Sequence, residues 1–249
     1  MKNKKVLFIV FAAIISFICI FIGVVFILAR PLSFYTFSPG SVFHLESIIR
    51  TEAIENSEGG NFLIVHTSIK RGNNVERIAC HFRSYCEVFE VTNGESLLNE
   101  ENRYQATQRM KNAQTNARIV ALEYLEIDYE LIIEFDLPIV NGVPISDHSG
   151  GIMFTLEIIN QLSVVDLTSG HIIAGTGTIE IDGSVGTVGG IPQKVAAADR
   201  VGANVFFVPI ANYEQAEEIA NLLSTEMRIY GITSLNGALD ILERLEPTN

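Results

Sequence analysis

The chain has 249 residues, with 17 lysines and arginines against 29 aspartates and glutamates and a formal net charge of −12. Residues 1–30 hold four basic residues and no acidic one, so residues 31–249 carry 13 basic against 29 acidic residues, a net charge of −16. Such an acidic surface favours solubility and argues against nucleic acid or anionic lipid as a partner. The length of residues 31–249 suffices for one extracytoplasmic domain of ordinary size.

The chain begins with a long apolar run. Residues 6–29 are 24 positions without a charge, enough at 1.5 Å per residue to span a hydrocarbon core of ~30 Å. Lysines at positions 2, 4 and 5 precede the run, so the positive-inside rule predicts a cytoplasmic N-terminus and an extracytoplasmic location for residues 30–249. A cleaved signal peptide is the alternative, but its apolar region is normally about 7–15 residues long. The sequence therefore favours a single-pass anchor in the cell membrane, within residues 1–30.

Three cysteines are present. Cys19 lies in the apolar run, where packing is its expected role, whereas Cys80 and Cys86 lie on the predicted outer side. An oxidising compartment would allow Cys80 and Cys86 to form a disulfide, and the sequence leaves both the bonded and the reduced state open. His81 stands between them, but a fourth ligand at zinc spacing is missing, so no metal is expected.

The remaining chain predicts an α+β fold, a mixed sheet with packed helices. Residues 31–99 have the pattern of a small β-rich segment, and residues 100–249 that of the main domain. Strands are predicted at 34–37, 42–45, 62–67, 129–137, 204–208 and 227–231, and turns at Ser38–Ser41, 55–60 and Asn93-Gly94. Helices are predicted at 213–223, at 234–245 with Ser234 as its cap, and at 100–125 with Tyr104, Met110, Ala113, Ala117, Val120 and Leu125 facing inward.

Ser149 stands before a helical pattern. Apolar residues at Ile152, Leu156 and Ile159 have the i, i+4, i+7 spacing of one helix face. A serine at a helix N-terminus is most often a simple N-cap. Gly150 and Gly151 favour a catalytic role, because they are poor helix formers but let another backbone approach closely. The amides of that helix end would also stabilise an oxyanion.

Lys194 lies just inside a second predicted helix, which starts near Pro192. A solvated surface lysine is the usual finding at such a position. Here the lysine is followed by a valine and three alanines. A lysine can act as a general base only where burial lowers its pKa toward neutrality. An apolar setting for Lys194 is therefore the condition for catalysis.

Serine and lysine occur within a longer ordered pattern. The chain resembles the proteolytic domain of the Lon family of Ser–Lys proteases, and most of all the ATP-independent, membrane-anchored Lon-like proteases of Gram-positive bacteria. The resemblance covers residues 100–245 well and 31–70 loosely. Its matching residues are Ser149-Gly150-Gly151, Leu156, Gln161-Leu162, Asp166-Leu167-Thr168, Ala174 to Ile179, Asp182-Gly183, Val185-Gly186, Gly189-Gly190-Ile191, Lys194 and Phe206 to Pro209.

The resemblance implies a role for each matched site residue. Ser149 would be the nucleophile and Lys194 its general base, and the hydroxyl of Thr176 would orient the lysine amine. The backbone at Asp147 and Ser149 is the candidate oxyanion hole. Substrates would be proteins or peptides, and the family tends to form six-membered rings.

Several motifs of other enzyme classes are absent. The sequence has no Walker-type phosphate loop and no His-Glu-x-x-His motif, so no ATPase, cofactor or metal is expected. Relatives of the membrane-anchored type carry a peptide-binding PDZ domain near residues 125–149. That interval is too short for one here.

The resemblance breaks immediately before the nucleophile. Family members carry Gly-Pro there, whereas this chain has Asp147-His148. An aspartate carboxylate could oppose a negative transition state. His148 as a histidine base is disfavoured, because adjacent side chains in an extended segment point to opposite faces. A catalytically impaired scaffold or binding protein therefore remains one alternative, and a signal-peptidase-like Ser–Lys hydrolase another.

Overall fold

The computed structural model describes residues 2–51, 59–83, 85–91, 99–128, 130–140, 143–144 and 148–248. The predicted turn at Asn93-Gly94, and most of the one at 55–60, lie outside these residues. The chain forms two compact units, one of residues 1–37 and 69–95 and the other of residues 38–68 and 96–249. These units cross the predicted boundary near residue 99, because residues 38–68 pack with the main domain.

A six-stranded mixed sheet forms the framework, with the strand order β12-β11-β8-β3-β1-β4. The pairs β3–β8, β8–β11 and β11–β12 are parallel, and the pair β1–β4 is antiparallel. The predicted α+β class with a mixed sheet is confirmed. The strands are β1 (Pro31–His44), β3 (Asn61–Asn73), β4 (Glu87–Glu90), β8 (Ile172–Gly175), β11 (Val205–Pro209) and β12 (Arg228–Ile232).

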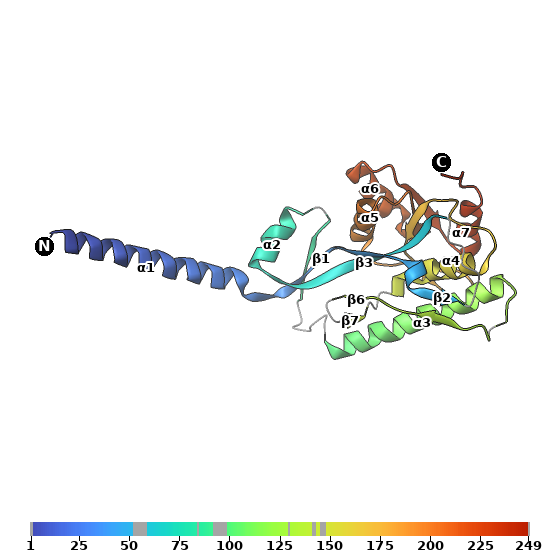
Figure 1. The fold of residues 1–249 in the computed structure, drawn as a ribbon, viewed down its shortest axis with the longest axis horizontal. Coiled ribbons are helices and arrows are strands. Elements are labelled where there is room, and N and C mark those ends of the chain that lie inside the picture. Colours follow the sequence, from blue (N-terminus) through green and yellow to red (C-terminus); the bar gives the residue numbers. More distant parts are fainter. Residues whose placement is uncertain are drawn as a thin grey trace. The chain divides into compact units, whose positions relative to one another are not determined.

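Helices cover both faces of the sheet in the second unit (Figure 1). On one side lie α3 (Glu100–Tyr124), α4 (Gly151–Leu162) and α7 (Leu235–Leu242), and on the other α5 (Ile191–Arg200) and α6 (Tyr213–Leu223). Strand side chains alternate between these layers. Phe62 and Phe207 belong to one buried cluster with α3, α4 and α7, while their neighbours Leu63 and Phe206 are buried on the opposite face.

The predicted helices agree closely with the observed ones. Helix α3 begins after Asn99, whose side chain accepts a hydrogen bond from the amide of Asn102, and Ser234 caps α7 in the same way. Of the residues predicted to face inward on α3, the central ones are buried. The prediction for Tyr104 is wrong, because 59% of its surface is exposed. The core does not cover the first turns of α3, so these turns are exposed to solvent.

Short elements complete the second unit. Of the strand predicted at 129–137, the structure shows only β5 (Ile133–Phe135), which pairs with the three residues of β2. The short strands are β2 (Ile49–Thr51), β5 (Ile133–Phe135), β6 (Ile139–Val140), β7 (Val143–Pro144), β9 (Thr178–Ile179) and β10 (Val185–Gly186), and the 3-10 turns are η1 (Leu45–Ser47), η2 (His148–Gly150) and η3 (Ile210–Asn212).

The turn predicted at Ser38–Ser41 is wrong, because β1 continues through these residues. A Cβ atom on Gly40 would lie 2.3 Å from the carbonyl oxygen of His66, on the neighbouring strand β3. Glycine is therefore needed for the close approach of two strands and not for a reversal of the chain.

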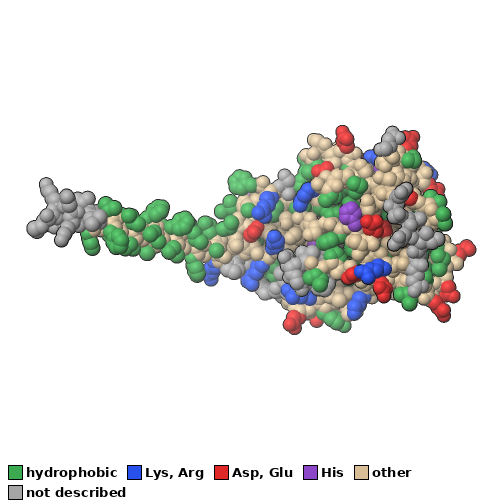
Figure 2. Space-filling view, in the orientation of Figure 1, with side chains coloured by type: hydrophobic (Ala, Val, Ile, Leu, Met, Phe, Trp, Pro, Cys, Tyr) green, Lys and Arg blue, Asp and Glu red, His purple; other side chains and the backbone are tan. Residues whose placement is uncertain are grey.

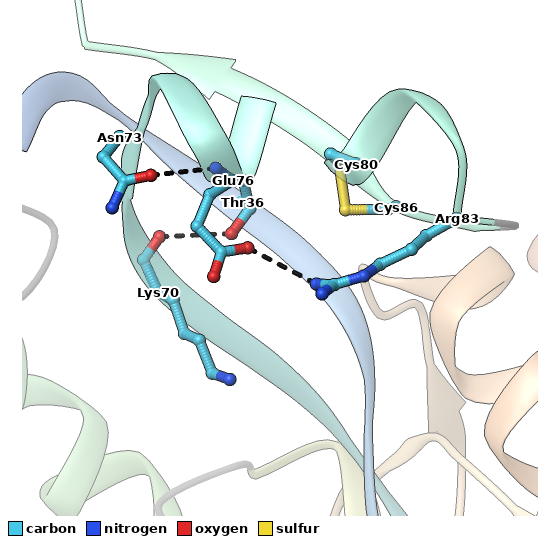
Figure 3. Close-up of polar contacts among 7 residues, drawn as sticks. All are labelled: Thr36, Lys70, Asn73, Glu76, Cys80, Arg83 and Cys86. Carbon is cyan, nitrogen blue, oxygen red and sulfur yellow. Dashed lines mark hydrogen bonds and ion pairs between the residues drawn. A yellow bond between two sulfur atoms is a disulfide. The ribbon is translucent and has the colours of Figure 1, made fainter. Parts of the chain in front are cut away.

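The first unit contains α1 (Lys2–Ala29), α2 (Asn74–His81), β4 and the adjoining ends of β1 and β3. Residues 8–29 of α1 are long and apolar enough to cross a membrane. The side chain of Asn73 caps α2, and Arg83 reaches back to Glu76 (Figure 3). Cys80 and Cys86 form a disulfide, with their Cα atoms 5.1 Å apart.

Candidate active site

Ser149 lies in the 3-10 turn η2, immediately before helix α4. Its side chain is 97% buried. The N-cap position of α4 is occupied by Gly150, which makes no side-chain capping bond. The Ser149 hydroxyl is hydrogen-bonded instead to the amine of Lys194. The simple N-cap interpretation of this serine is therefore wrong.

Gly151 explains why glycines follow the serine. A Cβ atom on Gly151 would lie 2.7 Å from the backbone nitrogen of Ile179. The strand β9 therefore passes directly over the first turn of α4, at a distance that only glycine permits. The predicted close approach of another backbone is confirmed, and it brings the loop between β8 and β9 next to Ser149.

Lys194 projects from the first turn of α5, where its amide donates to the carbonyl of Gly190. Only 2% of its surface is exposed, in contrast to the usual solvated lysine. Valine and alanines that follow it along α5 are buried as well. Such desolvation disfavours the charged form of an amine, and the neutral form is the one that can accept a proton.

Thr176 joins the serine to the lysine. It follows the last residue of β8, where its amide donates to Phe207 on β11. Its hydroxyl donates to the Ser149 carbonyl oxygen at 3.1 Å and accepts from the Lys194 amine at 3.2 Å. The amide of Gly177 donates to the same carbonyl. Three elements, η2, α5 and the end of β8, therefore meet at this threonine.

Of the two predicted oxyanion-hole residues, Ser149 has its backbone at the N-terminal end of α4. Asp147 lies outside the described residues. His148 occupies the same 3-10 turn as Ser149 and is partly exposed. The described part of the chain contains no group of three or more histidine, cysteine or acidic side chains suited to a metal ion.

Two further buried polar groups lie beside α5 and were missed at the sequence level. Thr67 Oγ1 would be 2.6 Å and Gln193 Oε1 3.7 Å from a Cβ atom on Gly190. Within the described residues, Thr67 Oγ1 and Gln193 Nε2 have no hydrogen-bond partner. Unsatisfied buried groups of this kind are rare and costly. Thr67 stands between His66 and Ser68 in the sequence, so no local signal singled it out.

Glu157 is a second residue that sequence reasoning left without a role. It lies two turns beyond Ser149 on α4 and is 97% buried. Burial raises its pKa to about 7, against the opposing effect of a 2.7 Å hydrogen bond from Gln161. The negative charges of Glu46 and Asp166 raise it further. Gln161 also donates to the carbonyl of Ile49, which fixes α4 to β2.

Serine peptidases in which lysine replaces histidine pair a serine hydroxyl with a buried amine in this way. The comparison with known families agrees with this class. Residues 111–244, more than half of the chain, match the Lon protease (S16) C-terminal proteolytic domain. The chain belongs to this family.

Distant relatives carry the same name. The chain is similar to the Lon protease of Chloroflexus aggregans, with 29% identity over 107 residues, or 43% of this chain and 13% of that protein. The Lon protease of Malacoplasma penetrans is 29% identical over 133 residues, or 49% of this chain and 17% of that protein. The chain thus spans less than a fifth of the length of these relatives.

Glu157 makes the stability of the protein depend on pH. Between pH 4.5 and about 7 the folded protein retains a proton that the unfolded chain has released, so stability falls as the pH rises through this window. Glu157→Gln keeps an oxygen that can accept from Gln161 but cannot ionise. The unfolding free energy of Glu157→Gln minus that of the wild type should therefore increase by up to about 3 kcal/mol from low to high pH.

Urea unfolding of the full chain at several values between about pH 4 and pH 8 measures this difference. Glu123→Gln, which changes an exposed carboxylate on α3, is the matched control and should show a pH-independent difference. A Glu157→Gln difference that also stays constant with pH would contradict the prediction.

Proposed function

We propose that the protein is an ATP-independent, membrane-anchored serine endopeptidase, with Ser149 as nucleophile and Lys194 as general base. The observation that carries the proposal is the hydrogen bond between the buried Lys194 amine and the buried Ser149 hydroxyl. Hydrolysis by a serine nucleophile requires direct contact between the nucleophile and its base, and a third group that holds the base.

The single proton of the Thr176 hydroxyl determines how the base is oriented. Because that proton is donated to the Ser149 carbonyl, the Thr176 oxygen must accept from Lys194. A neutral amine that donates one hydrogen to Thr176 can direct its lone pair at the Ser149 hydroxyl. Thr176 is therefore a positioning residue for the base.

The reaction then follows in two halves. Lys194 Nζ takes the Ser149 proton as Oγ attacks the carbonyl carbon of a peptide bond, and the resulting oxyanion is stabilised by backbone amides at the start of α4. The protonated amine gives its proton to the leaving nitrogen, which breaks the peptide bond and leaves an acyl-enzyme. Water, deprotonated by the same amine, releases the second product and restores Ser149.

The depth of the site bears on the substrate. Because Ser149 and Lys194 are both at least 97% buried, a rigid folded surface cannot reach them. An extended segment, such as an unfolded or exposed stretch of a protein, is the substrate that fits. Next to Lys194, the unpaired Thr67 and Gln193 groups are available to bind polar backbone atoms of such a segment.

The anchor and the ring assembly belong to the proposal as well. We assign residues 1–30 to the cytoplasmic N-terminus and the membrane helix, and the rest to the extracytoplasmic side. The Cys80–Cys86 disulfide supports an oxidising compartment for this part of the chain. A homo-hexamer is carried over from the resemblance to the membrane-anchored Lon-like proteases, whereas the lack of a PDZ domain is a departure from them.

The first test is proteolysis of an unfolded protein by the full chain in detergent. Ser149→Ala and Lys194→Ala should each reduce the rate by about a thousandfold or more, because each removes one half of a unit that acts together. Ser47→Ala and Lys111→Ala, which change exposed residues of the same types, are the controls and should keep full activity.

Equal activity of all these variants would exclude this site as the source of hydrolysis. A well-folded wild type without activity under any condition would favour the second candidate function, an impaired Lon-like scaffold or binding protein. The observation favouring that candidate is Asp147-His148 in place of the family's Gly-Pro.

The second test addresses Thr176. Thr176→Val preserves the shape of the side chain but removes the hydroxyl that holds Lys194, so the rate should fall by about tenfold to a hundredfold, equivalent to one hydrogen bond to a charged or polar group. Thr176→Ser restores the hydroxyl and should recover most of the rate. An equal loss in both variants, measured as kcat with an intact fold, would contradict an orienting role.

The third test addresses topology. A membrane-impermeant thiol reagent applied to intact cells should label Cys80 and Cys86 only after reduction of their disulfide. The same cells without reductant are the control. Labelling that requires permeabilised cells would place the domain on the cytoplasmic side, and release of the protein from the membrane at high pH would favour a cleaved signal peptide.

A further inference from the structure

The first unit exposes apolar side chains outside its long helix. Val75, Ile78 and Phe82 follow the i, i+3, i+7 spacing of one face of α2 and of the turn after it, and Val88 lies on β4. Phe82 is 81% exposed, and the other three are between 38% and 54% exposed. We call these four residues the α2 apolar face.

The four residues form a continuous surface. Ile78, Phe82 and Val88 line one hollow of about 440 Å³, together with the Cys80–Cys86 disulfide and with Arg77 and His81. Val75 lies one turn before Ile78. The disulfide closes the short loop that carries Phe82 and so limits the ways in which this ring could withdraw into the protein. Soluble surfaces rarely present a contiguous apolar patch, and such patches mark binding sites for proteins or membranes.

A hydrogen bond fixes where α2 begins relative to the long apolar helix. The Asn74 side-chain amide donates to the carbonyl oxygen of Ile27 at 3.2 Å. Ile27 lies in the last turn of α1, whose final carbonyls have no partner within the helix. The first residue of α2 therefore lies where the apolar segment of residues 8–29 ends.

The lengths involved keep α2 close to a membrane surface. An eight-residue helix is about 12 Å long, and the headgroup region adds roughly 5–8 Å beyond the hydrocarbon core on each side. If α1 spans the bilayer, as the proposed function assumes, the start of α2 lies at the outer boundary of the hydrocarbon. An apolar face at that depth is next to lipid.

The charges around the α2 apolar face are already compensated. Arg77 pairs with Glu90 at 2.7 Å and lies over the ring of Phe34, and Arg83 pairs with Glu76 at 3.3 Å. The parts of the first unit beyond α1 hold five basic and four acidic residues at positions 30–37 and 69–95, so the excess negative charge belongs to the second unit. The excess negative charge that argues against anionic lipid as a partner of residues 31–249 is therefore absent from this part of the chain.

We propose that the α2 apolar face binds the lipid interface of the membrane that holds α1, with Phe82 and Ile78 inserted among the acyl chain ends and headgroups. This inference rests on the proposed membrane anchor. Because the arginines are paired, the contact is apolar and does not require anionic lipid. Figure 2 shows hydrophobic side chains along α1, and the residues of the α2 apolar face are likewise exposed.

The chain contains no tryptophan, so a single introduced tryptophan reports its own surroundings. Phe82→Trp and Ile78→Trp would be made in the full chain and reconstituted into phosphatidylcholine vesicles, with and without brominated acyl chains. Both variants should emit at shorter wavelength than a water-exposed tryptophan and lose at least half of their fluorescence to the brominated lipid. Aqueous iodide should quench them several-fold less than a tryptophan in water.

Two control variants separate the causes of failure. Val164→Trp, at a 90% exposed apolar position of the second unit, should be quenched by iodide and not by brominated lipid. Phe17→Trp lies in the middle of α1 and should be quenched strongly by brominated lipid. Without quenching at Phe17, the anchor itself is wrong.

With quenching at Phe17 but not at Phe82 or Ile78, the anchor holds and the α2 apolar face does not touch lipid. A blue-shifted Phe82→Trp emission that neither quencher changes would show that a protein covers this face, and would also overturn the proposal.

Discussion

The structure depends on keeping a lysine amine and a serine hydroxyl in contact inside a protein core. Lys194 lies in the first turn of α5 and Ser149 in the 3-10 turn immediately before α4, and these two helices lie on opposite faces of the sheet. The two side chains can meet only where the sheet ends, and Thr176, the first residue after β8, is located at that point. Its hydroxyl makes the hydrogen bonds that hold the serine backbone and the lysine amine in register.

Burying the polar side chains of Ser149, Thr176 and Lys194 costs free energy, and the packing of the surrounding apolar residues offsets that cost. The strand β11 is fully buried, and most residues of β8 and α4 are buried and apolar. This packing leaves little space for the three side chains to take other positions. Other costly buried groups are the raised-pKa carboxyl of Glu157 on α4 and the unpaired Thr67 and Gln193 beside Gly190.

The two compact units differ in how they meet their surroundings. The second unit carries the excess negative charge and buries its apolar residues in the core. The first unit carries a net positive charge, with eight basic and four acidic residues, and leaves apolar side chains exposed on α1, α2 and β4. A single chain with two such surfaces suits a proposed enzyme that works in water while held at a lipid boundary. The disulfide in the first unit is the one covalent constraint among the described residues.

The sequence by itself determined the elements whose signals are local. Apolar spacing predicted α4 and α6, Ser234 marked the start of α7, and the order of serine, glycines, threonine and lysine predicted the family. Only the tertiary structure decided which residues are close in space. It replaced the turn at Ser38–Ser41 with a continuous strand and exposed Tyr104, because strand pairing and the extent of the core are set by distant residues. The burial of Lys194, on which a catalytic role depends, is likewise a property of the packed sheet and helices and not of the helix that carries it.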